Sequence, residues 1–138
     1  GKKTDDISKA DIILLGVSRT SKTPTSIYLS NRGYKTVNIP LVMEQDIPEE
    51  IKKSNFRTCV IGLYADPDRL YDIRRNRIAI SNEKGTTTYT DLDHISEEVR
   101  NSQKLFKQYN WPTIDVTRKS VEETAASIIK IHDIKKNK

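Results

Sequence analysis

The residues best suited to chemistry in this sequence form one segment, 16–23, which reads Gly-Val-Ser-Arg-Thr-Ser-Lys-Thr. An apolar run at 12–15 precedes it, and a helix-like segment follows at 24–32. A strand, a tight loop and a helix form a polyphosphate site when main-chain N–H groups and the helix dipole surround the anion. The lysine of such a loop reaches the terminal phosphates, and the adjacent hydroxyl binds Mg²⁺. We therefore expect a nucleotide to contact Gly16, Val17, Ser18, Arg19, Thr20, Ser21, Lys22 and Thr23, with Thr23 beside the metal.

One position departs from the G-x-x-x-x-G-K-[ST] pattern, because Ser21 stands where the second glycine is expected. If the backbone there has a positive φ angle, serine is strained where glycine would not be. The alternative interpretation is a polar loop between a strand and a helix, with Lys22 simply in the first helical turn. On the nucleotide interpretation, Lys22 and Arg19 are the catalytic cations.

A second informative stretch begins with an apolar segment, residues 57–63, that reads as a buried strand. Asp66 and Pro67 follow in the order favoured at the N-cap and first position of a helix. Planar guanidinium groups pair two phosphate oxygens at once, so arginines on that helix suit a transferring phosphoryl group. We expect Arg74 and Arg77 to bind phosphate, although a solvated helix face explains any single arginine equally well. The arginines of this helix are Arg69, Arg74, Arg75 and Arg77.

A third stretch lies near the C-terminus, where residues 113–116 read as a short strand. Asp115 and Arg118 fall at its carboxyl end, which is where open α/β sheets bind ligands. We expect both to bind the nucleotide; the alternative for Asp115 is that it only caps the turn. Ser120 then begins a helix with an S-x-x-E capping box.

Phosphoryl transfer to an alcohol also needs a base, and a carboxylate near the end of the second or third strand suits that role. Glu44, Asp46 and Asp66 qualify by position, and the sequence does not choose among them. Asp66 fits better as a helix N-cap. Between Glu44 and Asp46 the choice stays open, and we take Asp46 as the catalytic candidate.

Composition excludes several classes of protein. The 138 residues suffice for one domain with a core, and no apolar run is long enough to span a bilayer. The formal net charge of +5 suits an anionic ligand, but lysines crowd the C-terminal end and weaken the case for a nucleic-acid surface. A single cysteine, Cys59, excludes an intramolecular disulfide and fits a reducing compartment. We therefore predict a cytoplasmic protein with neither a membrane nor a nucleic-acid partner.

The elements that must position these residues alternate between apolar strands and helices. Strands are expected near 11–15, 34–39, 57–63 and 113–116. This alternation predicts a three-layer α/β domain with a parallel sheet over 10–138, after a frayed tail at 1–9. Because the only methionine is Met43, we expect Gly1 to be a cut edge and the chain to be a fragment of a longer protein.

The second stretch resembles the segment before the lid of small P-loop kinases, such as nucleoside monophosphate and shikimate kinases. A more specific resemblance covers nearly the whole chain, from about residue 10 to residue 133. Several separated blocks, in the same order, are similar to the regulatory proteins of pyruvate, phosphate dikinase and of phosphoenolpyruvate synthase. The blocks are 16–26, 38–42, 66–70 with Ile73, Arg74 and Arg77, and 114–125.

This resemblance implies a P-loop kinase-like domain and an unusual pair of reactions. Members of that family use ADP to phosphorylate a threonine of the target enzyme, and they remove the phosphate with inorganic phosphate, releasing pyrophosphate. On this resemblance Lys22 would contact the β-phosphate of ADP, Thr23 would face Mg²⁺, and Arg19 would hold a phosphate of the target or inorganic phosphate. Family members are about twice as long, with an additional N-terminal region. A homodimer is a further expectation.

Two other functions stay open at this point. A small-metabolite kinase of the shikimate or nucleotide kinase type would prefer ATP and need no protein acceptor. A non-catalytic basic binding module would bind with an affinity that falls steeply as the salt concentration rises and that does not depend on Lys22. The sequence also leaves open whether the target is the dikinase or the synthase.

Overall fold

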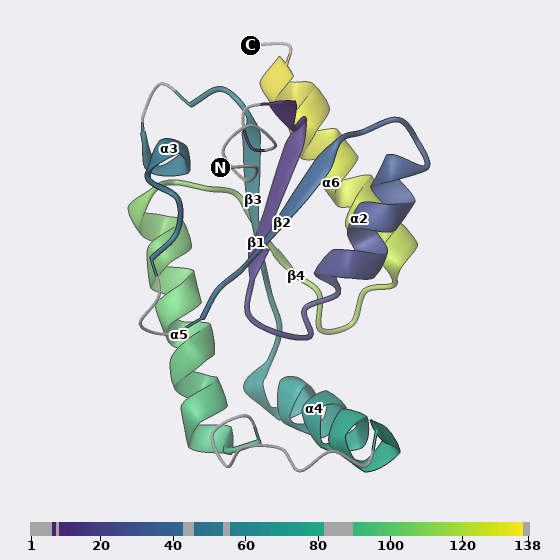
Figure 1. Cartoon of the computed structure of the whole chain (residues 1–138), viewed down its shortest axis with the longest axis vertical. Coiled ribbons are helices and arrows are strands. Elements are labelled where there is room, and N and C mark those ends of the chain that lie inside the picture. The colour runs from purple at the N-terminus through teal and green to yellow at the C-terminus, as the bar shows by residue number, and fades with distance from the viewer. Residues whose placement is uncertain (1–6, 8, 43–45, 54–55, 82–89, 137–138) are drawn as a thin grey trace.

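A sheet of four parallel strands forms the centre of the part of the chain that the structure describes, with the order β2-β1-β3-β4. This computed structural model describes residues 7, 9–42, 46–53, 56–81 and 90–136, with the backbone alone for 79–81. The strands are β1 (Ile12–Gly16), β2 (Thr36–Pro40), β3 (Cys59–Tyr64) and β4 (Thr113–Asp115). Because all four run in one direction, their carboxyl ends meet at one edge of the sheet (Figure 1). The predicted parallel α/β fold is confirmed.

Helices cover both faces of the sheet and complete the three predicted layers (Figure 1). On one face α2 (Lys22–Ser30) packs against α6 (Val121–Lys136), while α5 (Leu92–Gln108) and the short α3 (Glu49–Lys52) lie on the other. By contrast, α4 (Pro67–Ser81) lies beyond the carboxyl edge and contacts α5. None of the described helices combines the length and apolarity that crossing a membrane requires.

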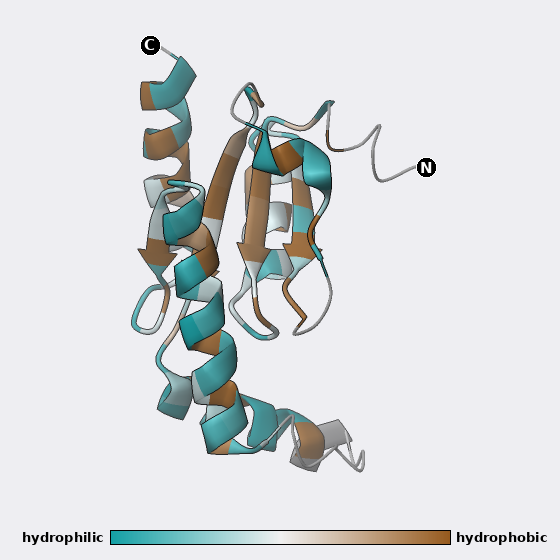
Figure 2. Cartoon of the chain, turned by 90° about the vertical axis from the view of Figure 1, so that its left-hand side faces the viewer, coloured by the Kyte–Doolittle hydropathy of each residue, from teal (hydrophilic) through white to brown (hydrophobic). Residues whose placement is uncertain are grey.

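The central strand β1 shows why the sheet is buried on both sides. All five of its residues, Ile-Ile-Leu-Leu-Gly, are inaccessible to solvent, as a near-continuous apolar run predicts for a strand covered by helices on both faces. Figure 2 shows the strands coloured hydrophobic along most of their length, with hydrophilic residues on the outer helices. The three-layer arrangement therefore follows directly from where the apolar residues lie.

Helix ends follow the signals in the sequence. Gly33 has a φ angle of 91° just beyond α2, as predicted for a left-handed stop. At the start of α5, the N–H of Asp93 donates to Asp91 Oδ1 at 3.0 Å. The predicted capping box of α6 is confirmed, because Glu123 N–H donates to Ser120 Oγ (3.1 Å) and Ser120 N–H donates to Glu123 Oε1 (3.2 Å).

Some boundaries differ from the prediction. Helix α2 begins at Lys22, two residues before the predicted start, so the lysine belongs to the helix rather than to the loop. Gly85 and three successive threonines predict a loop over 79–90. Helix α4 continues through Ser81, so this prediction is wrong for its first three residues, since no glycine or proline interrupts the helix there. Residues 82–89 of the expected loop lie outside the described residues. Ile7, which the sequence placed in the tail, is buried in the core.

The core has two parts, one on each face of the sheet, and Gly62 shows how tightly the α5 face is packed. A Cβ atom at this position of β3 would lie 2.5 Å from Cδ2 of Phe106, whose side chain on α5 has no exposed surface. The ring therefore lies directly on the strand backbone. This contact fixes how closely α5 approaches the sheet.

Replacing Gly62 by alanine should destabilise the domain by about 1–3 kcal/mol, because a buried ring with no free space must move. The free energy of unfolding in urea measures the effect. The double variant Gly62→Ala/Phe106→Leu should recover part of the loss, since leucine leaves room for the added methyl group. Equal destabilisation in the single and double variants would contradict the assigned contact.

Candidate phosphate-binding site

The loop between β1 and α2 begins at a glycine that no other residue can replace without a clash. A Cβ atom on Gly16 would lie 2.5 Å from Thr20 Oγ1 and 3.0 Å from the carbonyl oxygen of Leu63. The loop thus folds back against its own start and against β3. On the other side, the Leu41 N–H donates to the Gly16 carbonyl at 3.0 Å, which ties the loop to the end of β2.

Ser21 occupies the left-handed region, with φ 64° and ψ 24°, so the position that favours glycine in phosphate-binding loops does require a positive φ angle here. A non-glycine residue in this conformation costs roughly 1–2 kcal/mol. Arg19, with φ 70°, adopts a second positive angle in the same loop. Such strain persists where the surroundings enforce it, commonly at ligand sites.

The N-terminus of α2 is open to an anion. Ser21, its N-cap, makes no side-chain capping hydrogen bond, and the first turn contains no acidic residue. The first N–H groups of a helix lack intrahelical partners and lie at the positive end of its dipole. Pro24, in this first turn, removes one donor that the helix would not use. The remaining donors belong to Lys22 and Thr23.

Lys22 turns back over the loop. Its Nζ donates to the Val17 carbonyl at 2.8 Å and lies 3.4 Å from Thr20 Oγ1. The buried Thr20 hydroxyl donates to the same Val17 carbonyl at 2.8 Å. Burial, followed by the charges of Arg74 and Arg19, lowers the pKa of Lys22 to about 8. Three cations, one each from the loop, α2 and α4, therefore lie close together here.

A cavity of about 430 Å³ opens at this loop and is lined by five of the eight loop residues predicted to contact the nucleotide. Its lining includes no carboxylate among the described residues, so its charge suits an anion. Thr23, the predicted Mg²⁺ ligand, lines it together with Lys22. The complete lining is Ser18, Arg19, Ser21, Lys22, Thr23, Pro24, Pro40 and Ile73.

The arginine helix lies beside the loop, as the sequence predicts, but its two predicted phosphate ligands differ in exposure. Arg74 is 1% exposed; its Nη2 donates to the Ser18 carbonyl at 3.2 Å and to Glu98 Oε2 at 3.0 Å. Arg77 is exposed on the next turn of α4. Direct phosphate binding by either residue stays a prediction, and Arg74 already contacts the loop backbone.

Asp115 organises a turn, which is the alternative that the sequence left open. Its Oδ1 accepts hydrogen bonds from the backbone N–H (3.0 Å) and the hydroxyl of Thr117. Thr117 Oγ1 in turn accepts from the N–H of Asp66 at 2.9 Å, which ties this turn to the start of α4. Arg118 is exposed in the same turn. Neither Asp115 nor Arg118 lines the loop cavity.

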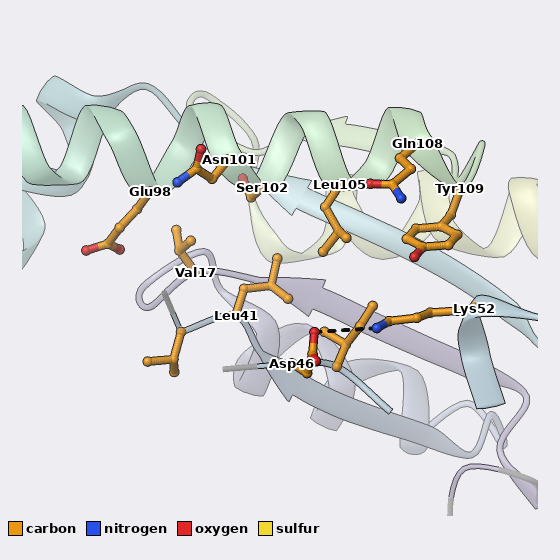
Figure 3. Close-up of a pocket in the computed structure, with 12 residues that line it drawn as sticks. Val17, Leu41, Asp46, Lys52, Glu98, Asn101, Ser102, Leu105, Gln108 and Tyr109 are labelled. Carbon is orange, nitrogen blue, oxygen red and sulfur yellow. Dashed lines mark hydrogen bonds and ion pairs between the residues drawn. The ribbon is translucent and has the colours of Figure 1, made fainter. Parts of the chain in front are cut away.

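The candidate base lies in a different cavity. Asp46 is a largely exposed carboxylate whose Oδ1 is 3.5 Å from Lys52 Nζ. It lines a space of about 400 Å³ between α5 and the segment that follows β2 (Figure 3). This second cavity adjoins the loop, because Val17 and Glu98 are part of its wall. Of the other candidates, Glu44 lies outside the described residues, and Asp66 precedes α4 as its expected N-cap.

Sequence reasoning missed Glu98, and it expected Thr20 to contact the nucleotide rather than to hold the loop together through the Val17 carbonyl. Glu98 holds the guanidinium of Arg74 with both carboxylate oxygens, at 3.3 and 3.0 Å. Helical periodicity distinguishes it from the exposed Glu97, because Glu98 lies three residues after the buried Ile95 and Glu97 lies on the opposite side of α5. Glu98 also lies four residues after His94, whose Nε2 is 3.3 Å from Glu98 Oε1. The role of Thr20 depends on the fold of the loop, which composition does not reveal.

Known proteins resemble this chain along nearly its whole length. The family described as Kinase/pyrophosphorylase matches residues 1–129. A protein of Pelagibacter ubique is 63% identical over 99% of this chain and 50% of its own length, and one of Erythrobacter litoralis is 54% identical over 91% and 45%. Both have the provisional name pyruvate, phosphate dikinase regulatory protein, and this chain spans about half the length of each. The chain belongs to the Kinase/pyrophosphorylase family.

Proposed function

We propose that this domain provides the phosphate-binding site of a regulatory enzyme that acts on pyruvate, phosphate dikinase. In one direction it transfers the β-phosphoryl group of ADP to a threonine of the dikinase and switches it off. In the other it moves that group to inorganic phosphate, forms pyrophosphate and restores the dikinase. Support comes from the family match and from the names of relatives such as the Pelagibacter ubique protein.

The observation that most strongly favours this function is the arrangement of Lys22. Its ammonium group donates to the Val17 carbonyl, and the residue lines a cavity without described carboxylates at an uncapped helix N-terminus. A diphosphate entering the cavity replaces a carbonyl oxygen with an anionic oxygen, which makes a stronger, charge-assisted hydrogen bond. The carbonyl thus holds the ammonium group in position until the anion arrives.

Both proposed reactions use the same cations. In the kinase direction, the threonine hydroxyl oxygen bonds to the β-phosphorus, the bond to the bridging oxygen breaks, AMP leaves, and a base accepts the hydroxyl proton. In the phosphorylase direction, an oxygen of inorganic phosphate attacks the phosphothreonine phosphorus, and the threonine oxygen leaves with a proton. Each transfer develops charge on phosphoryl oxygens, which Lys22 and the loop N–H groups stabilise. One loop therefore serves both directions.

Magnesium fits this site as a companion of the nucleotide. Thr23 supplies one hydroxyl, and the described residues contain no group of three or more His, Cys, Asp or Glu side chains that could hold a metal alone. Mg²⁺ usually keeps several waters and binds through one or two protein groups plus substrate phosphates. When bound, the ion neutralises charge on the phosphates.

Replacing Lys22 by alanine should weaken ADP binding about tenfold to a hundredfold, since a hydrogen bond to a charged group contributes about 1.5–3 kcal/mol. Isothermal titration calorimetry with ADP and Mg²⁺ measures the dissociation constant. Lys104→Ala, an exposed lysine on α5, is the matched control and should bind as the wild type does. Equal binding by Lys22→Ala and the wild type would remove the loop from the proposal.

Affinity for ADP should also fall with rising pH above about 8, where Lys22 loses its proton. Because an anion favours the ammonium form, binding above that pH requires proton uptake, and the affinity drops by up to about tenfold per pH unit. The phosphates of ADP do not titrate in this pH range, since they lose their last proton near pH ~6. Lys22→Arg, which stays charged, should bind with a constant affinity from pH ~7.5 to ~9.5. A flat profile in the wild type would contradict the assigned role.

The reaction itself is tested with ADP labelled at the β-phosphate and purified pyruvate, phosphate dikinase. Mass spectrometry should find phosphothreonine and AMP, and added inorganic phosphate should then produce pyrophosphate. The full-length Pelagibacter ubique relative, incubated in parallel, controls for the assay. Transfer from ATP to a small metabolite, with none from ADP to the dikinase, would support a metabolite kinase instead.

A further inference from the structure

Arg74 is a charged side chain that the fold buries almost completely, with 1% of its surface exposed. Burying a guanidinium group is unfavourable unless its charge is paired and its N–H groups are hydrogen-bonded. Glu98 provides the pairing through two hydrogen bonds, from Nη1 to Oε1 at 3.3 Å and from Nη2 to Oε2 at 3.0 Å. The same Nη2 also donates to the Ser18 carbonyl at 3.2 Å. The guanidinium group therefore links α5 to the phosphate loop.

Glu98 is itself held in place. Its side chain is 14% exposed, and His94, one turn earlier on α5, places Nε2 at 3.3 Å from Oε1. Figure 3 shows Glu98 and Val17 at the same end of the α5 cavity, whose wall also includes Asp46 and Lys52. The carboxylate is thus oriented from its own helix toward the loop.

The charge of Lys22 is sensitive to Arg74, the cationic member of this pair. Two cations face the ammonium group: Arg19 from the loop and Arg74 from α4, and both lower its pKa. From α5, the carboxylate of Glu98 lies between Arg74 and His94 and opposes the charge of Arg74. Removing this carboxylate takes away a negative charge that is paired with Arg74.

We propose that Glu98 is a positioning residue of the phosphate loop: it fixes the guanidinium of Arg74 on the Ser18 carbonyl and offsets its charge. The loop and the ammonium group of Lys22 then keep the arrangement that an incoming diphosphate needs. This assigns Arg74 an indirect role through the loop, in place of the direct phosphate contact expected from the sequence. The inference rests on the proposed function only in taking a diphosphate as the ligand.

A titration of the Lys22 side chain by NMR tests the proposal without any nucleotide. Glu98→Gln should lower the pKa of Lys22 by about half a unit or more, because the variant loses a negative charge paired with Arg74, and Arg74→Gln should raise it by a similar amount. If Glu98 and Arg74 only stabilise the loop, both variants should shift the pKa of Lys22 in the same direction, because both loosen the same loop. Glu97→Gln makes the same charge change at an exposed neighbour and should leave the Lys22 pKa unchanged.

Affinity for ADP supplies the second measurement, as a double-mutant cycle. Glu98→Gln and Arg74→Gln should each weaken binding about tenfold at pH ~7, and the double variant should bind as Arg74→Gln alone does, because Glu98 acts only through Arg74. Glu98→Asp, which keeps the charge, should recover part of the affinity.

Three results overturn the proposal: Glu98→Gln behaving like Glu97→Gln, both single variants shifting the Lys22 pKa in one direction, or the double variant binding more weakly than Arg74→Gln. If Glu98→Gln does not fold, the double variant replaces it, since two neutral amides leave no unpaired charge. Wild-type protein that binds no ADP would reject the proposed ligand, and the NMR titration would still decide the role of Glu98.

Discussion

The contact between the Lys22 ammonium group and the Val17 carbonyl is the interaction on which this site depends. It requires a loop tight enough to present a main-chain oxygen to the first residue of the following helix. Gly16 permits that tightness, and Ser21 accepts a left-handed conformation to complete it. The parallel sheet then places the loop at the edge where all strands end, so that α4 reaches it from the end of β3.

A buried ion pair, Arg74 with Glu98, holds the loop at Ser18. Arg74 and Glu98 come from helices that contact each other beyond the carboxyl edge, and their hydrogen bonds reach the loop at Ser18. Buried pairs of this kind contribute little net stability, because desolvation offsets their attraction. Their value here is geometric, since they fix a loop whose backbone is strained. The α5 cavity, with Val17 and Glu98 in its wall, therefore adjoins both supports of the loop.

Much of the fold could be predicted because strong local signals coincided with it. The apolar run of β1, the Gly33 stop and the Ser120 capping box each specify local geometry, and alternation of strands and helices specifies a parallel sheet. The loop could be predicted for the same reason, since its residues are contiguous. The approach of Arg74 to the loop follows from topology, because both leave neighbouring strands at one edge.

The remaining features depend on contacts between distant residues. Helical periodicity distinguishes Glu98 from Glu97, but a weakly amphipathic α4 gives no register for its contact with Arg74. Asp46 was selected by its position after β2, yet the path of the following segment directs it to the α5 cavity. From the sequence, Asp115 suits ligand binding and turn formation equally well, and its contacts with Thr117 show that it forms the turn. Side-chain direction, rather than sequence position, decides such cases.

The position of the Lys22 side chain over its own loop affects the rate at which an anion can bind. Because the ammonium group already lies over the loop, the Lys22 side chain does not have to become ordered when an anion arrives, and the entropy of ordering that side chain is not lost at that step. Encounter is then governed by diffusion and by the attraction of clustered positive charge, which decreases as ionic strength rises. Discrimination among anions passes to the rate at which each one leaves.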